Sequence, residues 1–157
     1  MAIYYTDRSR SFSAADGHGV HRMELVAEAI VDVTTAMIDN ANDEVGLFWL
    51  PAGAVVTGIT ASATDMDTNG TPGLAFDIGD DGDEDRLLVA SNIGQAGTLS
   101  TALARTGHLY KYTARTRIKA YVQTAAATAA AGTLYVSVRY FVDPEYSTTA
   151  LAASTTA

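Results

Sequence analysis

The chain has 157 residues, no cysteine and a net charge of −8 at pH 7. A chain of roughly 150 residues suits one domain with its own core, and the missing cysteines exclude disulfides and thiolate metal sites. The acidic balance argues against nucleic acid as a partner, because affinity for phosphates comes largely from lysine and arginine. Residues 1–10 lack the apolar core of a signal peptide, and no apolar run is long enough to span a membrane, so we expect no membrane association.

The two ends of the chain lack strand and helix periodicity. Residues 1–21 are expected to form an extended N-terminal arm, and residues 147–157, rich in Ala and Thr, a flexible tail. His18 and His21 lie in a glycine-rich loop without a third ligand nearby, which favours a solvated loop over a metal site. Residues 22–146 then form a single β-sandwich domain. The arm offers aromatic and basic side chains as interface candidates: Tyr4, Tyr5, Arg8, Arg10 and Phe12.

Residues 23–35 fit two secondary-structure templates. A period of two places the odd-numbered residues inward and Glu24, Glu28 and Asp32 outward, whereas a period of 3.6 places the same acids opposite a helical apolar stripe. We favour a strand, because the β-branched residues suit a pleated surface and the sequence that follows is typical of β structure.

Short strand-like segments continue along the chain, separated by turns rich in Gly, Pro and Asp. The segments cover residues 45–50, 54–63, 74–78 and 109–113. This spacing predicts an all-β fold, a single-domain antiparallel β-sandwich that is jelly-roll-like. Trp49, the only tryptophan, lies in the first of these segments, where a tryptophan is more commonly a core residue.

An acidic segment at residues 79–85 is a weak candidate for binding Ca²⁺, because hard cations take carboxylate oxygens. Its spacing does not match an EF-hand, since position twelve falls on Leu88 where a bidentate glutamate is required. We favour a solvated loop that opens a short helix near residues 84–90, where negative charge suits the helix N-terminus. No cofactor is expected. The candidate ligands are Asp80, Asp81, Asp83 and Asp85.

The clearest alternation of apolar and polar residues lies at residues 115–124 and 133–142, which an alanine-rich link joins. We predict that these segments pair as a hairpin at the centre of the sandwich, with Ile118 and Val136 in the core. The outer face of this hairpin is too basic for a core and too aromatic for bare solvent, which indicates a subunit interface. Its members are Arg115, Arg117, Lys119, Tyr121, Tyr135 and Phe141.

Catalytic motifs are not found in the sequence. Three histidines are the only bases of suitable pKa, none lies in a diagnostic motif, and no Gly-x-Ser-x-Gly elbow occurs. We therefore expect that the protein is not an enzyme.

Acidic residues gather at residues 65–85 and basic residues at 105–139, and these groups can pair either within one chain or between copies.

A series of turns and strand ends carries a family resemblance: Leu50-Pro51-Ala52-Gly53-Ala54-Val55-Val56, Asp67-Thr68-Asn69-Gly70-Thr71-Pro72, Ile78-Gly79-Asp80-Asp81-Gly82-Asp83, Ile93-Gly94-Gln95-Ala96-Gly97, Ala131-Gly132-Thr133-Leu134 and Tyr140-Phe141-Val142-Asp143. The series resembles small virion structural proteins of tailed bacteriophages, of the capsid decoration (cement) type. The resemblance covers residues 22–143 and rests on turns, so it is more specific for the fold than for the role.

This resemblance implies a jelly-roll-like sandwich that assembles as a trimer, binds the major capsid protein and stabilises the assembled shell. The expected location is the outer surface of the capsid in the virion, after synthesis in the host cytoplasm. The alternative hypothesis is a glycan- or receptor-binding β-sandwich module of a phage tail or fibre, because jelly rolls also serve as lectins. Exposed aromatic residues such as Trp49, Tyr110 or Tyr112 would then contact the ligand.

Overall fold

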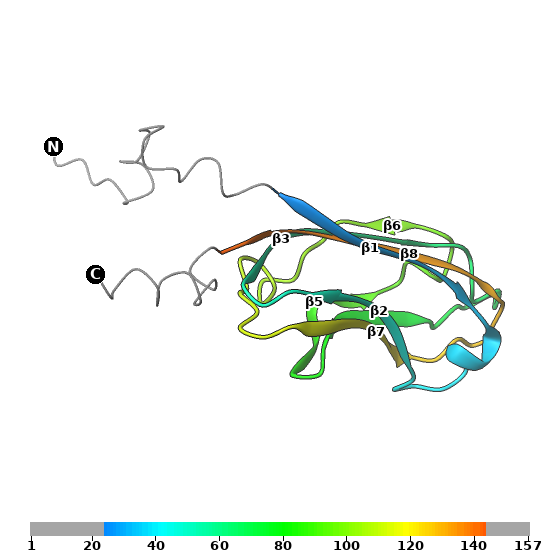
Figure 1. The fold of residues 1–157 in the computed structure, drawn as a ribbon. Helices are drawn as coiled ribbons and strands as arrows, with labels where there is room; N and C mark the ends of the chain where they lie inside the picture. The colour runs from blue at the N-terminus through cyan, green and yellow to red at the C-terminus, as the bar shows by residue number, and fades with distance from the viewer. Residues whose placement is uncertain (1–23, 144–157) are drawn as a thin grey trace, which may run out of the picture.

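A computed structural model describes residues 24–143, which form two stacked four-stranded sheets (Figure 1). The strand order is β1-β8-β3-β6 in one sheet, the β1 sheet, and β2-β7-β4-β5 in the other, the β2 sheet, with all neighbours antiparallel. This order is that of a jelly roll, so the predicted antiparallel all-β sandwich is confirmed. The elements are β1 (Leu25–Val33), the 3₁₀ helix η2 (Thr35–Met37), β2 (Glu44–Leu50), β3 (Ala54–Ala63), β4 (Ala75–Asp80), β5 (Asp83–Ser91), β6 (Leu99–Ser100), β7 (Thr116–Thr124) and β8 (Gly132–Val142).

Strand β1 is the segment whose pattern also fitted a helix, and the strand prediction is confirmed. It pairs with β8 along its whole length, from Leu25 opposite Tyr140 to Val33 opposite Gly132. Val33 is buried in the core, whereas Ile30 on the outer face is 72% exposed. The period of two therefore places one face of β1 on the core and leaves the other in solvent.

The predicted hairpin of residues 115–124 and 133–142 is wrong in its pairing, although both segments are strands. β7 and β8 lie at inner positions of opposite sheets, and their inward faces, including Ile118 and Val136, meet across the core. A hairpin needs a short turn, usually of two to five residues. The link at residues 125–131 instead crosses between sheets that pack about 10 Å apart.

The helix predicted near residues 84–90 is also wrong, because these residues belong to β5. Strands β4 and β5 form an antiparallel hairpin whose turn is the dipeptide Asp81-Gly82, a pair that favours two-residue hairpins. Gly79 permits the close approach of the two strands, since a Cβ atom there would collide with the main chain of Asp83 and Glu84. The acidic run therefore forms a β-hairpin rather than a helix start.

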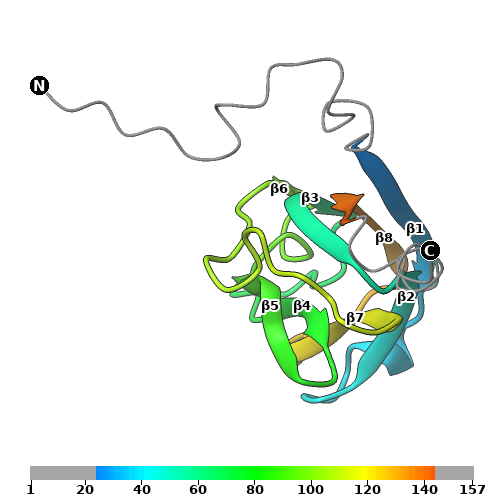
Figure 2. The same ribbon diagram turned by 60° about the vertical axis from the view of Figure 1, so that its left-hand side comes forward.

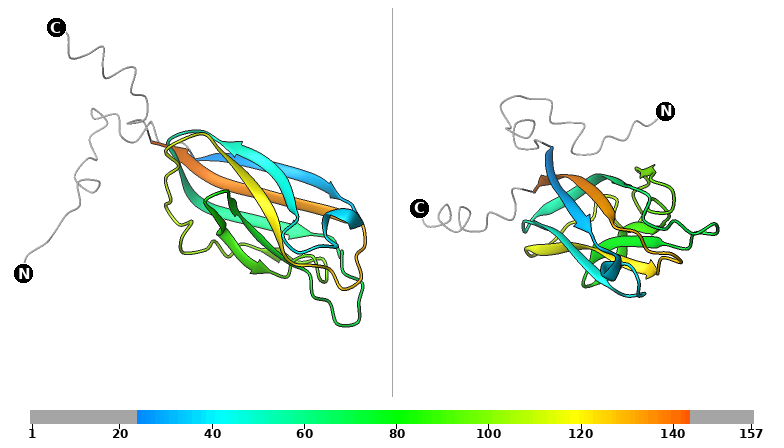
Figure 3. Two further views of the ribbon diagram at one scale, coloured as in Figure 1. Left: turned by 90° about the horizontal axis from the view of Figure 1, so that it is seen from below. Right: turned by 90° about the vertical axis from the view of Figure 1, so that its right-hand side faces the viewer.

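The sandwich has two distinct ends. The end where β1 begins and β8 finishes is called the terminal end, and the opposite end, with η2, the β3–β4 loop and the β7–β8 link, is called the distal end (Figure 3). β1 and β2 lie along one side of the sandwich, and β5 and β6 lie along the other (Figure 2). The predicted arm at residues 1–21 and tail at 147–157 lie outside the described residues.

Candidate functional site

One buried carboxylate organises the distal end. Asp67, in the β3–β4 loop, is 1% exposed. Five main-chain N–H groups donate to its oxygens over 2.7–3.4 Å, those of Asn69, Gly73, Leu74, Ala127 and Thr128. Burial raises the pKa of Asp67, but the main-chain hydrogen bonds outweigh it and hold the pKa far below its usual range. The carboxylate therefore joins the β3–β4 loop to the β7–β8 link.

A buried ion pair occupies the terminal end. The Arg86 side chain donates from Nε to Oδ2 of Asp80 at 2.6 Å, and its guanidinium carbon lies 3.9 Å from the centre of the Tyr110 ring. Burial raises the pKa of Asp80, but the hydrogen bonds from Arg86 and the Gly82 N–H, together with the charge of Arg86, outweigh burial and lower the pKa. Tyr112 packs edge-on against Tyr110, and burial together with the charge of Asp80 raises the pKa of Tyr112.

The structure does not bring the Ca²⁺ candidate residues together. Asp80 pairs with Arg86, whereas Asp81 accepts a hydrogen bond from Lys119. Asp83 lies beside Asp85, whose hydrogen bond raises the pKa of Asp83. Among residues 24–143, no three His, Asp or Glu side chains are grouped so that they could hold a metal ion. The four carboxylates therefore do not form a common ligand set.

The outer face of the β2 sheet is divided by charge. Lys119 on β7 bonds Asp81 of the β4–β5 hairpin turn on one side and Glu44 of the edge strand β2 on the other. These two carboxylates raise the pKa of Lys119. Tyr121 is buried beside Lys119, and burial raises its pKa. Glu84 is close enough for its charge to raise that pKa further. This half of the face is thus acidic around one neutralised lysine.

The other half of this face holds Trp49, Arg115 and Arg117, together called the Trp49 patch. Trp49 is 50% exposed, so its expected place in the core is wrong. The guanidinium carbon of Arg115 lies 4.6 Å from the centre of the Trp49 ring, close enough for a cation–π contact. Arg117 is opposite Trp49 in the ladder and covers Gly46, where a Cβ atom would collide with the guanidinium group. Glycine at position 46 therefore lets Arg117 lie against the sheet.

The predicted single interface is split between two faces. Tyr135 and Phe141, on β8, lie on the β1 sheet, whereas the other described candidates lie on the β2 sheet or at its rim: Arg115, Arg117, Lys119 and Tyr121. The split follows from the sheet change between β7 and β8. The arm candidates lie outside the described residues: Tyr4, Tyr5, Arg8, Arg10 and Phe12.

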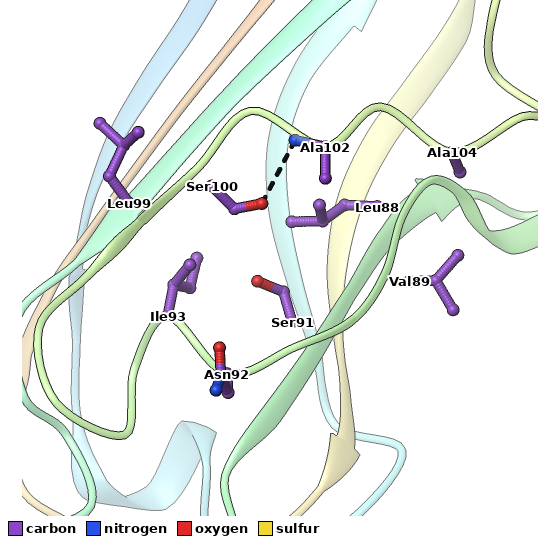
Figure 4. Close-up of a pocket in the computed structure, with 9 residues that line it drawn as sticks. All are labelled: Leu88, Val89, Ser91, Asn92, Ile93, Leu99, Ser100, Ala102 and Ala104. Carbon is purple, nitrogen blue, oxygen red and sulfur yellow. Dashed lines mark hydrogen bonds between the residues drawn. The ribbon is translucent and has the colours of Figure 1, made fainter.

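A shallow hollow of about 370 Å³ lies on the side formed by β5 and β6 (Figure 4). Its lining mixes apolar and polar groups and includes Val89, 50% exposed, and Leu99, 63% exposed. Ser100 accepts a hydrogen bond from the Ala102 N–H at 3.3 Å (Figure 4). The lining carries no acid, base or lysine that could perform acid–base chemistry.

In the described part of the chain, no helix is long and apolar enough to cross a membrane.

Comparison with known proteins decides the family. No protein-family model matches the sequence, and neither does any curated protein. A chain in the solved structure of the cyanophage Pam1 capsid asymmetric unit is 35% identical, with a TM-score of 0.74, over 90% of this chain and 100% of that chain. The chain belongs to this family of phage capsid proteins.

Two further capsid structures share the fold of this phage capsid protein. A chain in the capsid of Ralstonia phage GP4 has a TM-score of 0.64 and 24% identity, over 77% of this chain and 85% of that one. A chain in the acidic stable capsid structure of Helicobacter pylori bacteriophage KHP30 has a TM-score of 0.53 and 19% identity, over 78% of this chain and 90% of that one. At these identities the likeness concerns the fold alone.

Family membership confirms the broad functional predictions. The phage capsid protein has a capsid-associated structural role in the virion and is not an enzyme.

Sequence reasoning missed two features, the exposure of Trp49 and the hydrogen bonding of Asp67. The first had a signal, because Trp49 adjoins Leu50 in one strand and the period of two turns them to opposite faces. The hydrogen bonding of Asp67 had no sufficient signal, because the donors Ala127 and Thr128 lie 60 and 61 positions away in the chain.

Proposed function

We propose that this phage capsid protein is a decoration, or cement, protein that binds the outside of the assembled capsid and stabilises it. The observation that carries the proposal is the 35% identity to a chain of the Pam1 capsid asymmetric unit, over the full length of that chain. The major capsid protein is the proposed partner. Neither nucleic acid nor a membrane is expected to bind, in keeping with the net charge of −8.

Capsid stabilisation by such a protein follows from mass action. A ligand that binds the assembled lattice and not its free subunits shifts the equilibrium toward the lattice. Many identical contacts, each weak, then act together over the shell. We further propose a trimer as the binding unit, because an oligomer that contacts several shell subunits at once gains from the same effect.

The direct experiment mixes the purified protein with expanded heads that lack it. We expect saturable binding at near-physiological salt and a higher temperature of head disruption. Heads of an unrelated phage are the control and are expected to gain neither. Absence of binding would contradict the proposal, and binding to host glycans in its place would favour the tail or fibre alternative.

A further inference from the structure

The Trp49 patch presents two arginine side chains that have no acidic partner among the residues the structure describes. Within residues 24–143, neither Arg115 nor Arg117 forms a salt bridge, although the chain as a whole carries a net charge of −8. Both residues are exposed; Arg115 lies over the half-exposed ring of Trp49, and Arg117 is paired opposite Trp49 in the β2–β7 ladder. We propose that the Trp49 patch binds the acidic β4–β5 hairpin of a second copy of this chain. The inference rests on the proposed oligomer and not on attachment to heads.

The composition and rigidity of the patch suit a protein interface. Tryptophan and arginine are enriched among residues that dominate binding energy, especially where an aromatic ring is flanked by groups that exclude water. The Arg115 guanidinium is stacked on the ring, and Gly46 lets the Arg117 guanidinium rest on the sheet. Two guanidinium groups that are already positioned lose less conformational freedom on binding carboxylates.

The complementary acids lie across the same sheet. Glu84, on β5, is exposed and has no salt bridge among the described residues. The Asp81 side chain is 76% exposed while it bonds Lys119, so its outer side faces solvent. Lys119 forms a salt bridge with Asp81 of its own chain, whereas Arg117 forms none with any of residues 24–143. The carboxylates of Glu84 and Asp81 are therefore accessible to a guanidinium group of a second copy.

The placement of the two surfaces favours contact between copies. The Trp49 patch lies at the β2 and β7 side of the sheet, and the hairpin forms its β4 and β5 side. Unlike surfaces at opposite edges give a head-to-tail contact, which closes into a ring when the rotation between copies permits. Three such contacts close the proposed trimer. Opposite charges facing each other also fix the orientation of the copies and disfavour other arrangements.

A charge exchange tests the contact. The variants are Arg117→Glu, Glu84→Arg and the combination of both, with Arg105→Glu, an exposed arginine outside the patch, as control. Analytical ultracentrifugation gives the assembly constant, and thermal melting verifies the fold. We expect each single variant to weaken assembly about 100-fold, because like charges then face each other. The combined variant is expected to recover assembly to within about 10-fold of the original chain, and the control to change nothing.

Other outcomes overturn the proposal in distinguishable ways. A trimer whose single variants assemble as well as the original chain, or whose combined variant shows no recovery, would exclude this contact and leave the proposed function standing. Variants that assemble normally but no longer bind heads would assign the patch to the shell instead. A chain that is monomeric at all concentrations would overturn the proposed trimer itself.

Trp49→Ala provides a second test, with assembly expected to weaken about 30-fold.

Discussion

The two ends of the sandwich each bury an aspartate, but they neutralise it differently. At the distal end, Asp67 is held by five main-chain N–H donors from two loops. At the terminal end, Asp80 is held mainly by one side chain, Arg86, which also lies over Tyr110. Main-chain donors fix the path of the loops that supply them, whereas a side-chain partner fixes only its own position.

This difference gives the two ends different sensitivities. Loss of the Asp67 charge leaves one buried and three partly buried N–H groups with a weaker acceptor, and it loosens two loops together. Loss of the Asp80 charge leaves Arg86 with Asp83, 3.5 Å away, and with the Tyr110 ring. We therefore expect the distal end to be the more sensitive to a change of a single carboxylate.

The largest expected effect comes from Asp67→Asn. The amide is a weaker acceptor than the carboxylate and turns an NH₂ group toward main-chain donors, so the free energy of unfolding should fall by about 3 kcal/mol. Chemical denaturation measures the change. Asp32→Asn, on the exposed face of β1, is the matched control and should change stability by less than about 0.5 kcal/mol. A loss for Asp67→Asn as small as that of the control would contradict the role of Asp67.

A smaller loss is expected for Asp80→Asn at the terminal end. Arg86 is mostly buried and keeps two of its contacts, so the free energy of unfolding should fall by about 2 kcal/mol. The double variant Asp80→Asn with Arg86→Met should be less destabilised than the sum of its parts, because it removes the uncompensated charge. Strict additivity in this double-mutant cycle would show that the two side chains do not interact.

The pH dependence sharpens the comparison. The pKa of Asp67 is lower in the folded protein than in the unfolded chain. The contribution of Asp67 to the free energy of unfolding is therefore complete above the unfolded pKa of about 3.9 and declines as the pH falls below that value. The decline is about 1.4 kcal/mol per pH unit until the folded pKa is reached. The difference in the free energy of unfolding between the original chain and Asp67→Asn should therefore narrow to about 1 kcal/mol at pH 2.5. A difference that grows on acidification would contradict the lowered pKa of Asp67.

The smallest effect is expected for Lys119→Met. Its bonds to Glu44 and Asp81 lie at the surface, where ion pairs contribute about 0.5 kcal/mol and are screened by salt. Denaturation at low and high salt measures the loss, which should shrink as salt is added. A loss above about 2 kcal/mol that is indifferent to salt would show that Lys119 stabilises the sheet by packing instead.

Alternation of apolar and polar residues was enough to predict most strands. It places β1, β7 and β8 correctly, because each has one face on a core that requires a period of two, and it finds β3 although a bulge between Val56 and Gly58 interrupts the period there. It failed for β5, where Leu87 and Leu88 are both buried and register shifts interrupt the ladder with β4. A bulged strand loses its period of two, and acids before adjacent apolar residues then resemble a helix start.

Strand pairing and surface sites were less accessible from the sequence. Whether β7 turns back on itself or crosses to the other sheet depends on the path of residues 125–131, which the Asp67 carboxylate and other distant contacts hold. The predicted interface inherited this error, since it assumed that Arg117 and Tyr135 share a face. Local patterns specify which face of a strand is buried, but not which strand lies beside it.

The most direct measurement of the proposed decoration role is an electron cryomicroscopy map of heads incubated with the purified protein. The proposal predicts added density on the outside of the shell, repeated over equivalent positions, into which the two-sheet sandwich fits. Heads prepared without the protein should lack this density. An unchanged outer surface at saturating protein, or density confined to the tail, would contradict a decoration role.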